Sequence, residues 1–188
     1  MQVFKLFKEF NCLMIIKTQF KDLLILKKKK FFDKRGYFQE LYDEKIIKKN
    51  FVFNVMSYSK KNVLRGLHIQ TKKPQGKLVT VIKGKIFDVA LDLRKNSKTF
   101  GKVFSIILSD RNSNSLYIPP GFAHGFFTLS NENYVNYSCT ERRHKNSETT
   151  IQYNDANLKI NWPRKKIIIS KKDNKGISFL NYKKIHHV

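Results

Sequence analysis

The chain has 188 residues, of which 41% are hydrophobic, and its formal net charge at pH 7 is +24. This length and apolar content suit one folded domain and exclude a disordered chain. The sequence contains no run of about 18 apolar residues, so it predicts no membrane span. The charge raises the question of nucleic-acid binding. Because only seven of the 38 basic residues are arginine and the lysines are scattered, we expect no specific nucleic-acid partner.

The N-terminal stretch "MQVFKLFKEFNCLMIIK" is basic and apolar, but Lys5, Lys8 and Glu9 interrupt it and no small-residue cleavage site follows. The sequence therefore predicts no signal peptide. The two cysteines, Cys12 and Cys139, form neither a metal-type pair nor a disulfide framework. This usage is typical of a reducing compartment, and we expect a cytoplasmic protein.

The remaining chain alternates apolar segments with turn signals. Residues 22–33 have the pattern of a strand that leads into a turn at Arg35-Gly36, and residues 41–49 are the only good helical candidate. From residue 51 onward, segments rich in β-branched and aromatic residues predict strands. These segments are 51–59, 62–70, 77–94, 102–110, 115–130, 133–141 and 149–154. Many short strands with regular turns predict an all-β sandwich or barrel, and a closed jelly roll with an interior ligand pocket suits the length.

His68 occupies an unusual position in the predicted strand "RGLHIQ" (65–70). Side chains alternate along a strand, so Leu67 and Ile69 point to one face and His68 to the other. His124 follows a rigid turn in "IPPGFAHGF". Neither histidine has a partner histidine two residues away, so we predict no metal site.

Three histidines, His144, His186 and His187, lie in polar or terminal segments, where we expect them to be exposed to solvent.

Further candidates for chemistry are Arg65, Lys77, Asp88, Tyr137 and one of the late carboxylates. Each alone has an ordinary structural explanation. Lys77 resembles an exposed lysine at a strand start, and Tyr137 fits a half-buried strand. Asp88 lies among apolar residues and needs a partner, for which a histidine is the simplest choice. Together, a histidine, a lysine and a tyrosine around a barrel interior suit proton transfer beside a carbonyl group.

Six collinear motifs resemble those of the dTDP-4-dehydrorhamnose 3,5-epimerases. The resemblance covers about residues 14–173 and implies a cupin-type jelly roll, or double-stranded β-helix. It also implies a homodimer without metal or cofactor. Such enzymes invert C3 and C5 of dTDP-4-dehydro-6-deoxy-D-glucose on the route to dTDP-L-rhamnose and surface polysaccharide. The motifs are "DKRGYFQE" (33–40), "NVLRGLHIQ" (62–70), "QGKLVTVIKGKIFDVALDLRKNSKTFG" (75–101), "LYIPPGFAHGF" (116–126), "VNYSCTE" (135–141) and "NDANLKINWP" (154–163).

The resemblance implies a role for each site residue. His68 corresponds to the general base, Asp173 to the carboxylate that orients it, Lys77 to the cation beside the enolate, and Tyr137 to the acid on the opposite sugar face. A region around residues 15–45 is expected to reach the pocket of the partner chain. The implied substrate-binding residues are Phe31, Arg35, Glu40, Arg65, His124 and Arg142.

The chain also departs from the family pattern. Phe53 and Val55 stand where the family usually has glutamine and asparagine, and Arg142 and Arg143 stand where it has aromatic residues. These changes leave open an enzyme that acts at one carbon only, a ketoisomerase, or another nucleotide sugar. A non-catalytic cupin that binds an anionic ligand is a further alternative. We expect residues 14–188 to form one domain, with residues 1–13 as an extension before the family's usual start.

Overall fold

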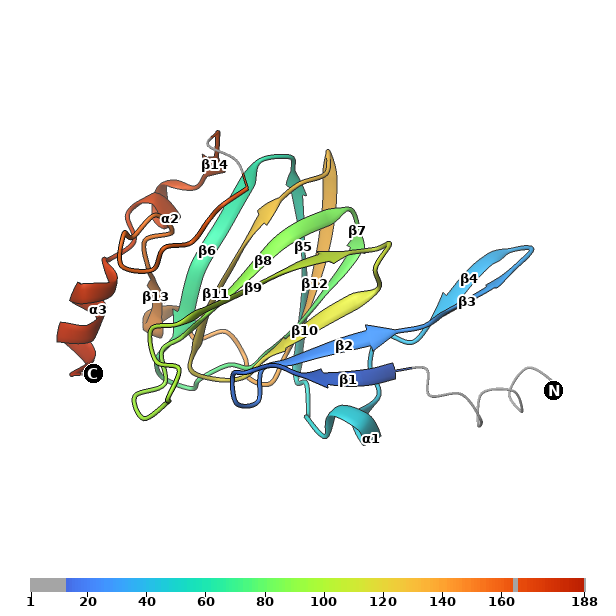
Figure 1. Cartoon of the computed structure of the whole chain (residues 1–188), viewed down its shortest axis with the longest axis horizontal. Coiled ribbons are helices and arrows are strands. Elements are labelled where there is room, and N and C mark those ends of the chain that lie inside the picture. The colour runs from blue at the N-terminus through green and yellow to red at the C-terminus, as the bar shows by residue number, and fades with distance from the viewer. Residues whose placement is uncertain (1–12, 164–165, 188) are drawn as a thin grey trace.

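Two largely antiparallel β-sheets packed face to face form the body of the molecule (Figure 1). The computed structural model describes residues 13–163 and 166–187. Within these residues, sheet 1 contains, in spatial order, β1 (Leu13–Lys17), β2 (Leu24–Lys28), β10 (Asn114–Ile118), β7 (Lys77–Lys83), β12 (Glu132–Cys139) and β5 (Phe53–Lys60). Sheet 2 contains β13 (Glu148–Thr150), β6 (Val63–Gln70), β11 (Phe122–Thr128), β8 (Lys85–Asp92) and β9 (Val103–Ser109), and β14 (Ile168–Ile169) pairs in parallel with β6. The predicted all-β jelly roll is confirmed.

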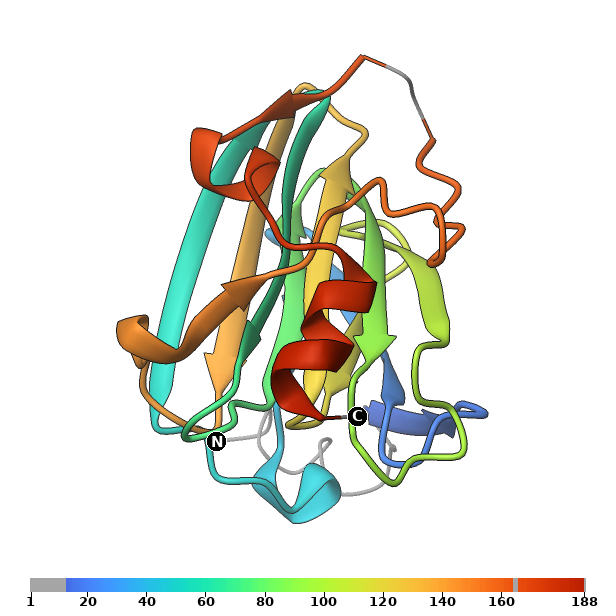
Figure 2. The ribbon, with the colours of Figure 1, turned by 90° about the vertical axis from the view of Figure 1, so that its left-hand side faces the viewer.

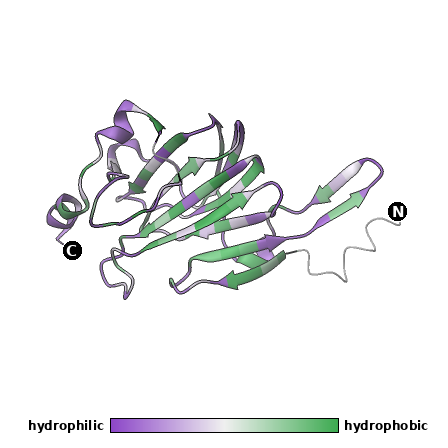
Figure 3. Ribbon diagram, turned by 45° about the horizontal axis from the view of Figure 1, so that its top comes forward, coloured by the Kyte–Doolittle hydropathy of each residue, from purple (hydrophilic) through white to green (hydrophobic). Residues whose placement is uncertain are grey.

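The alternation of side chains along each strand builds two apolar layers from sheet 2. In β8, Ile86 and Ala90 face sheet 1, whereas Val89 and Leu91 face the C-terminal segment. The layer between the sheets also contains Val79, Leu116 and Phe126, all at most 1% exposed. Hydrophobic segments accordingly concentrate on the strands of the two sheets in Figure 3. Burial of both layers fixes the register of the strands, because a shift by one residue would turn apolar side chains to the wrong face.

The C-terminal segment covers the outer face of sheet 2 with two helices that the sequence prediction missed. They are α2 (Lys171–Asn174) and α3 (Phe179–His186). Each begins with a serine whose hydroxyl accepts a backbone N–H of the first turn, Ser170 for α2 and Ser178 for α3. α3 lies across this face in Figure 2 and buries Phe179 and Tyr182 in the second apolar layer. The expected helix within 41–49 is confirmed as the single turn α1 (Glu44–Ile47).

Two of the three histidines expected to be exposed are half-buried, which corrects that prediction. His144 donates its backbone N–H to Gln70 and its ring nitrogen Nδ1 lies 3.0 Å from Ser147 Oγ, in a short 3₁₀ region at residues 145–147. The ring of His186 packs on Tyr182 with 4.3 Å between centroids. The ring partners are close in sequence, Ser147 three residues after His144 and Tyr182 one helical turn before His186, but sequence polarity alone does not show that these contacts form.

The N-terminal part of the chain adds an arm to the barrel. β3 (Lys30–Asp33) and β4 (Gly36–Gln39) form a two-stranded hairpin that projects away from both sheets (Figure 1). Leu13, the last residue of the expected extension, is the first residue of β1, and residues 1–12 lie outside the described part of the chain. Across the described residues, no helix has the length and apolar character that a membrane crossing requires.

Candidate active site

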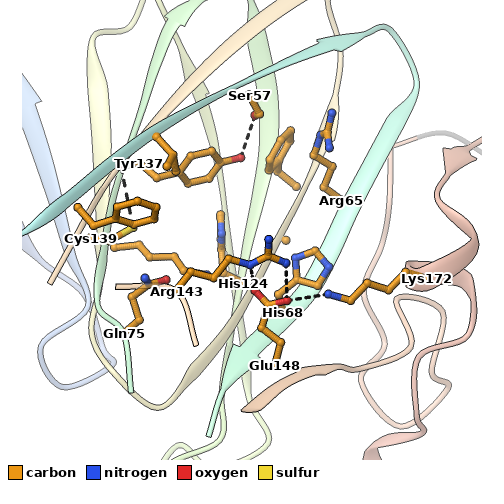
Figure 4. A pocket seen from close by; sticks show the side chains of 15 residues that line it. Ser57, Arg65, His68, Gln75, His124, Tyr137, Cys139, Arg143, Glu148 and Lys172 are labelled. Carbon is orange, nitrogen blue, oxygen red and sulfur yellow. Dashed lines mark hydrogen bonds and ion pairs between the residues drawn. The ribbon is translucent and has the colours of Figure 1, made fainter. Parts of the chain in front are cut away.

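A cavity of about 420 Å³ lies between the two sheets. Its walls come from inward-facing residues of β5, β7 and β12 in sheet 1 and of β6 and β11 in sheet 2 (Figure 4). One side is apolar and includes Phe53, Val55 and Cys139. The polar residues that line it are Ser57, Arg65, His68, Gln75, Lys77, His124, Tyr137, Arg143, Glu148 and Lys172. The structure thus gathers most of the predicted polar site residues around one space.

His68 and Asp173 form a close pair at this cavity. His68 Nε2 lies 2.7 Å from Asp173 Oδ1, and the two side chains are 33% and 6% exposed. Burial alone would raise the pKa of Asp173, but hydrogen bonding to His68 and to the Gly66 backbone N–H lowers it below its usual value. The charged carboxylate therefore accepts a hydrogen bond from Nε2–H of neutral His68, which leaves Nδ1 as the basic nitrogen.

The glycine before this histidine explains the "RGLH" motif. Gly66 has φ +114°, a conformation that side-chain-bearing residues rarely adopt. A Cβ at Gly66 would lie 2.5 Å from Gly125 Cα on the neighbouring strand β11. The same residue donates its N–H to Asp173 Oδ2 at 3.2 Å. Gly66 thus permits the close approach of β6 to β11 and presents an N–H to the carboxylate.

Asp88 and His124 form a second pair, which is fully enclosed. His124 Nε2 lies 2.8 Å from Asp88 Oδ2, and the two side chains are 5% and 0% exposed. The two residues lie on adjacent strands, β8 and β11, and both face inward. The expectation that Asp88 needs a histidine partner is confirmed. The pair holds the His124 ring at the cavity wall, where it packs edge-on against Tyr137 with 6.1 Å between centroids.

Tyr137 faces the cavity from sheet 1, opposite the strand that carries His68. Its hydroxyl lies 3.1 Å from Ser57 Oγ on β5. Burial strongly raises the pKa of the Tyr137 phenol, while the Ser57 hydrogen bond acts in the opposite direction. Tyr137 therefore holds its proton at neutral pH and presents it inside the cavity.

Lys77 lies at the start of β7 and also lines the cavity. Burial lowers the pKa of its ammonium group, whereas the negative charges of Glu148 and Asp88 and a Cys139 thiolate would raise it. Burial in turn raises the pKa of the Cys139 thiol, so this thiol is neutral near pH 7. Among the described residues, Lys77 forms no ion pair. In its protonated form, Lys77 can thus bind an anion that forms in the cavity.

Glu148 joins two cations at the edge of the cavity (Figure 4). Its carboxylate accepts from Arg143 Nε at 2.7 Å and Nη2 at 2.8 Å, and from Lys172 Nζ at 2.8 Å. The Arg143 hydrogen bond is the largest influence on Glu148, and despite partial burial the two cations lower its pKa to about 2. Lys172 precedes Asp173 in α2, so this cluster ties the helix of the His68–Asp173 pair to β13.

Four predicted substrate-binding residues do not line the cavity of their own chain. Phe31 and Arg35 lie on the β3–β4 hairpin and Glu40 follows it; Arg35 is exposed and pairs with Asp33 at 2.6 Å. Arg142 is exposed after β12, whereas its neighbour Arg143 lines the cavity.

Sequence reasoning missed Ser57, Gln75, Glu148 and Lys172 as lining residues. The alternation of β5 was a usable signal, because Phe53, Val55 and Ser57 share one face. Glu148 and Lys172 carried no comparable signal. In the part of the chain that the structure describes, no three histidine, cysteine or acidic side chains group as metal ligands would.

Comparison with known proteins matches this chain to one family. The family model described as dTDP-4-dehydrorhamnose 3,5-epimerase matches residues 17–181. The chain belongs to this family. The dTDP-4-dehydrorhamnose 3,5-epimerase of Methanothermobacter thermautotrophicus is 48% identical over 84% of this chain and 90% of its own length. The enzyme of the same name from Escherichia coli is 41% identical over 85% of this chain and 90% of its own length.

Solved structures of two nucleotide-sugar 3,5-epimerases support the fold as well. The Legionella pneumophila enzyme, in complex with dTDP-4-keto-L-rhamnose, has a TM-score of 0.85 and 42% identity and covers 90% of this chain and 93% of its own. The Bacillus anthracis enzyme, with TDP and pyrophosphate bound, has a TM-score of 0.86 and 37% identity, and the match covers 89% of this chain and 99% of its own. The predicted family membership is confirmed, and the chain is an isomerase of this family.

Proposed function

We propose that the chain inverts C3 and C5 of dTDP-4-dehydro-6-deoxy-D-glucose by removing and returning protons beside the 4-keto group. The observation that carries this proposal is the convergence of the His68–Asp173 pair, Lys77 and Tyr137 on one cavity in a chain of this family. Simple ligand binding needs neither a base nor an acid. This convergence therefore favours an enzyme over a non-catalytic cupin.

The first step is proton abstraction by His68. With Nε2 bonded to Asp173, the lone pair of Nδ1 accepts the proton from a carbon next to the ketone. The imidazolium that forms gains an ion pair with Asp173 at 2.7 Å. Histidine is the side chain that enzymes most often use as a general base.

The resulting negative charge moves to the ketone oxygen and forms an enolate. A carbon acid beside a ketone is too weak for an unaided imidazole, so the enolate needs a fixed positive charge. Lys77 is the cation that supplies it, because it lines the cavity and has no ion pair among the described residues. Lys77 is only partly exposed, so water screens this attraction less than it would at the surface.

The second proton transfer comes from Tyr137. His68 belongs to sheet 2 and Tyr137 to sheet 1, so the two groups meet a bound sugar from opposite walls. Removal from one face and return to the other inverts the carbon. Water from the solvent then restores the Tyr137 proton, and His68 releases its own.

Arg65 and His124 bind the substrate from the cavity wall in this proposal, and Arg142 contributes from the rim. Arg65 donates Nε to Ser59 Oγ at 2.9 Å and Nη2 to the Tyr58 carbonyl at 3.0 Å, which fixes the guanidinium beside the cavity. A diphosphate carries negative charge that such a guanidinium binds well.

We propose a homodimer in which each β3–β4 hairpin brings Phe31, Arg35 and Glu40 to the partner's cavity. Phe32, on the same hairpin, is 76% exposed, and an exposed aromatic arm that projects from a barrel suits burial in an interface. Coexpression of His68→Asn with Arg35→Ala tests this, since half of the dimers would then hold one intact site. We expect about one quarter of wild-type activity, whereas no recovery above the two separate variants would contradict the exchange of arms.

The activity is tested with dTDP-4-dehydro-6-deoxy-D-glucose in deuterated buffer. Deuterium at both C3 and C5, together with inverted product, is the expected result. Deuterium at only one carbon favours the alternative of a single-position epimerase. The apolar cavity wall formed by Phe53 and Val55 is the feature of this chain that raises this alternative. Absence of deuterium from both positions would refute the proposal. We also propose a cytoplasmic location, because the two cysteines of the sequence form no disulfide framework.

A further inference from the structure

Ser57 holds the hydroxyl of Tyr137 at a distance of 3.1 Å between oxygens. It lies on β5, which pairs with β12 so that Ser57 is opposite Val135 and Val55 is opposite Tyr137. Ser57 and Tyr137 are thus diagonal neighbours on the inward face of one strand pair. Ser57 follows Phe53 and Val55 on this face, so a hydroxyl ends an otherwise apolar wall.

Arg65 fixes the position of Ser57 through the backbone. Its guanidinium bonds to the Tyr58 carbonyl and the Ser59 hydroxyl, the two residues that follow Ser57 on β5. Because Arg65 belongs to β6 of the other sheet, these bonds tie the edge strand β5 across the cavity. The Ser57 backbone is therefore held in place, while the hydroxyl hydrogen can still rotate about the Cβ–Oγ bond.

The Tyr137 ring is equally well fixed. It packs against His124 and Phe126 with centroid distances of 6.1 and 6.4 Å. The acid step nevertheless leaves a phenolate in a buried site, and burial disfavours that charge. Of the groups around the phenol, Ser57 gives the largest opposing effect and Arg65 a smaller one, whereas Asp88 and a Cys139 thiolate would disfavour the phenolate further.

We propose that Ser57 is a positioning residue for the acid step, whose hydroxyl aims Tyr137 Oη and then donates a hydrogen bond to the phenolate. This inference rests on the proposed function. As the Tyr137 O–H bond breaks, its proton forms the new C–H bond of the sugar and the electron pair stays on Oη. The Ser57 hydroxyl turns to donate to that oxygen. A solvent proton later restores the phenol.

The variant Ser57→Ala tests the assignment in deuterated buffer. A hydrogen bond to a charged group affects a rate by about 10- to 100-fold. We expect inverted product to fall by this factor, while deuterium exchange into recovered substrate stays within about threefold, because His68 and Lys77 still form the enolate. A loss of binding or of folding would instead reduce product and exchange in the same proportion, and that result overturns the proposal.

Two further variants serve as controls. Ser57→Thr restores a hydroxyl and should return the ratio of product to exchange to within a few-fold of wild type. Ser138→Ala removes a hydroxyl from the same strand pair that does not line the cavity; Ser138 Oγ donates to Asn54 Oδ1 at 3.3 Å. This variant should leave the ratio of product to exchange unchanged. In the Tyr137→Phe background, Ser57→Ala should cause no further loss of product. An equal loss there would show that Ser57 acts independently of Tyr137.

A measurement without substrate separates this inference from the proposed activity. A fluorinated tyrosine at position 137, which ionises at lower pH than tyrosine, reports the phenolate by fluorine NMR. Ser57→Ala should move its titration midpoint upward by about 1 to 2 pH units, because the phenolate loses its donor. An unchanged midpoint overturns the Ser57 assignment even if the wild-type chain is an active epimerase, whereas inactivity of the wild type refutes the proposed function alone.

Discussion

Replacement of Asp173 by asparagine removes the negative charge beside the proposed base, His68, and keeps the shape of the side chain. In the wild type, His68 Nε2 and Asp173 Oδ1 are 2.7 Å apart. Coulomb's law gives an attraction of about 1.5 kcal/mol for that separation at the dielectric constant of water and about 6 kcal/mol at an effective value of 20. The His68 side chain is 33% exposed, which favours the lower half of this range, about 2–3 kcal/mol. The imidazolium that forms in the transition state loses this stabilisation, so deuterium exchange should slow by about 30- to 150-fold.

The assay follows deuterium entry at C3 and C5 of the sugar by NMR, with thermal unfolding as the check on folding. Asp155→Asn provides a matched control, because Asp155 is also a buried carboxylate that accepts backbone N–H groups, from Asn157 and Phe179. This control should lower the melting temperature and leave exchange within about threefold of wild type. A folded Asp173→Asn variant that exchanges within threefold of wild type would refute the role of Asp173 as the orienting carboxylate.

Three further predictions concern the acid, the acid-pH stability and metal dependence. Tyr137→Phe should lose inverted product far more than deuterium exchange, and equal losses by NMR would remove Tyr137 from the acid role. Because the Glu148 pKa is about 2 in the folded chain and ordinarily about 4.5, its stabilisation is present above pH 4.5 and is lost as pH falls towards 2. Urea unfolding at pH 5 and pH 2.5 should therefore show a larger loss for the wild type than for Glu148→Gln, and equal losses would contradict this. A chelator should leave the rate of epimerisation unchanged; a loss that a divalent ion reverses would overturn the metal-free mechanism.

The sequence by itself determined the strands and the class of fold, because turn residues and two-residue alternation are local properties of the chain. The predicted segments 62–70 and 102–110 correspond to β6 and β9, with boundaries that differ by at most one residue. The same alternation placed His68 on an inward face. It did not reveal α3, whose apolar residues become meaningful only when Phe179 and Tyr182 meet the outer face of sheet 2.

The tertiary structure alone decided which distant groups meet. The residues by themselves indicated only that one of the late carboxylates was a candidate for chemistry. The family resemblance implied that Asp173 orients His68, and the fold brings these two residues together across 105 positions of sequence. The Arg143–Glu148–Lys172 cluster and the Ser57–Tyr137 contact likewise join separate strands and loops. Such contacts depend on how the sheets close on each other, and no spacing within a single segment encodes that closure. A side chain's polarity predicts that it needs a partner, and only the packed fold supplies one.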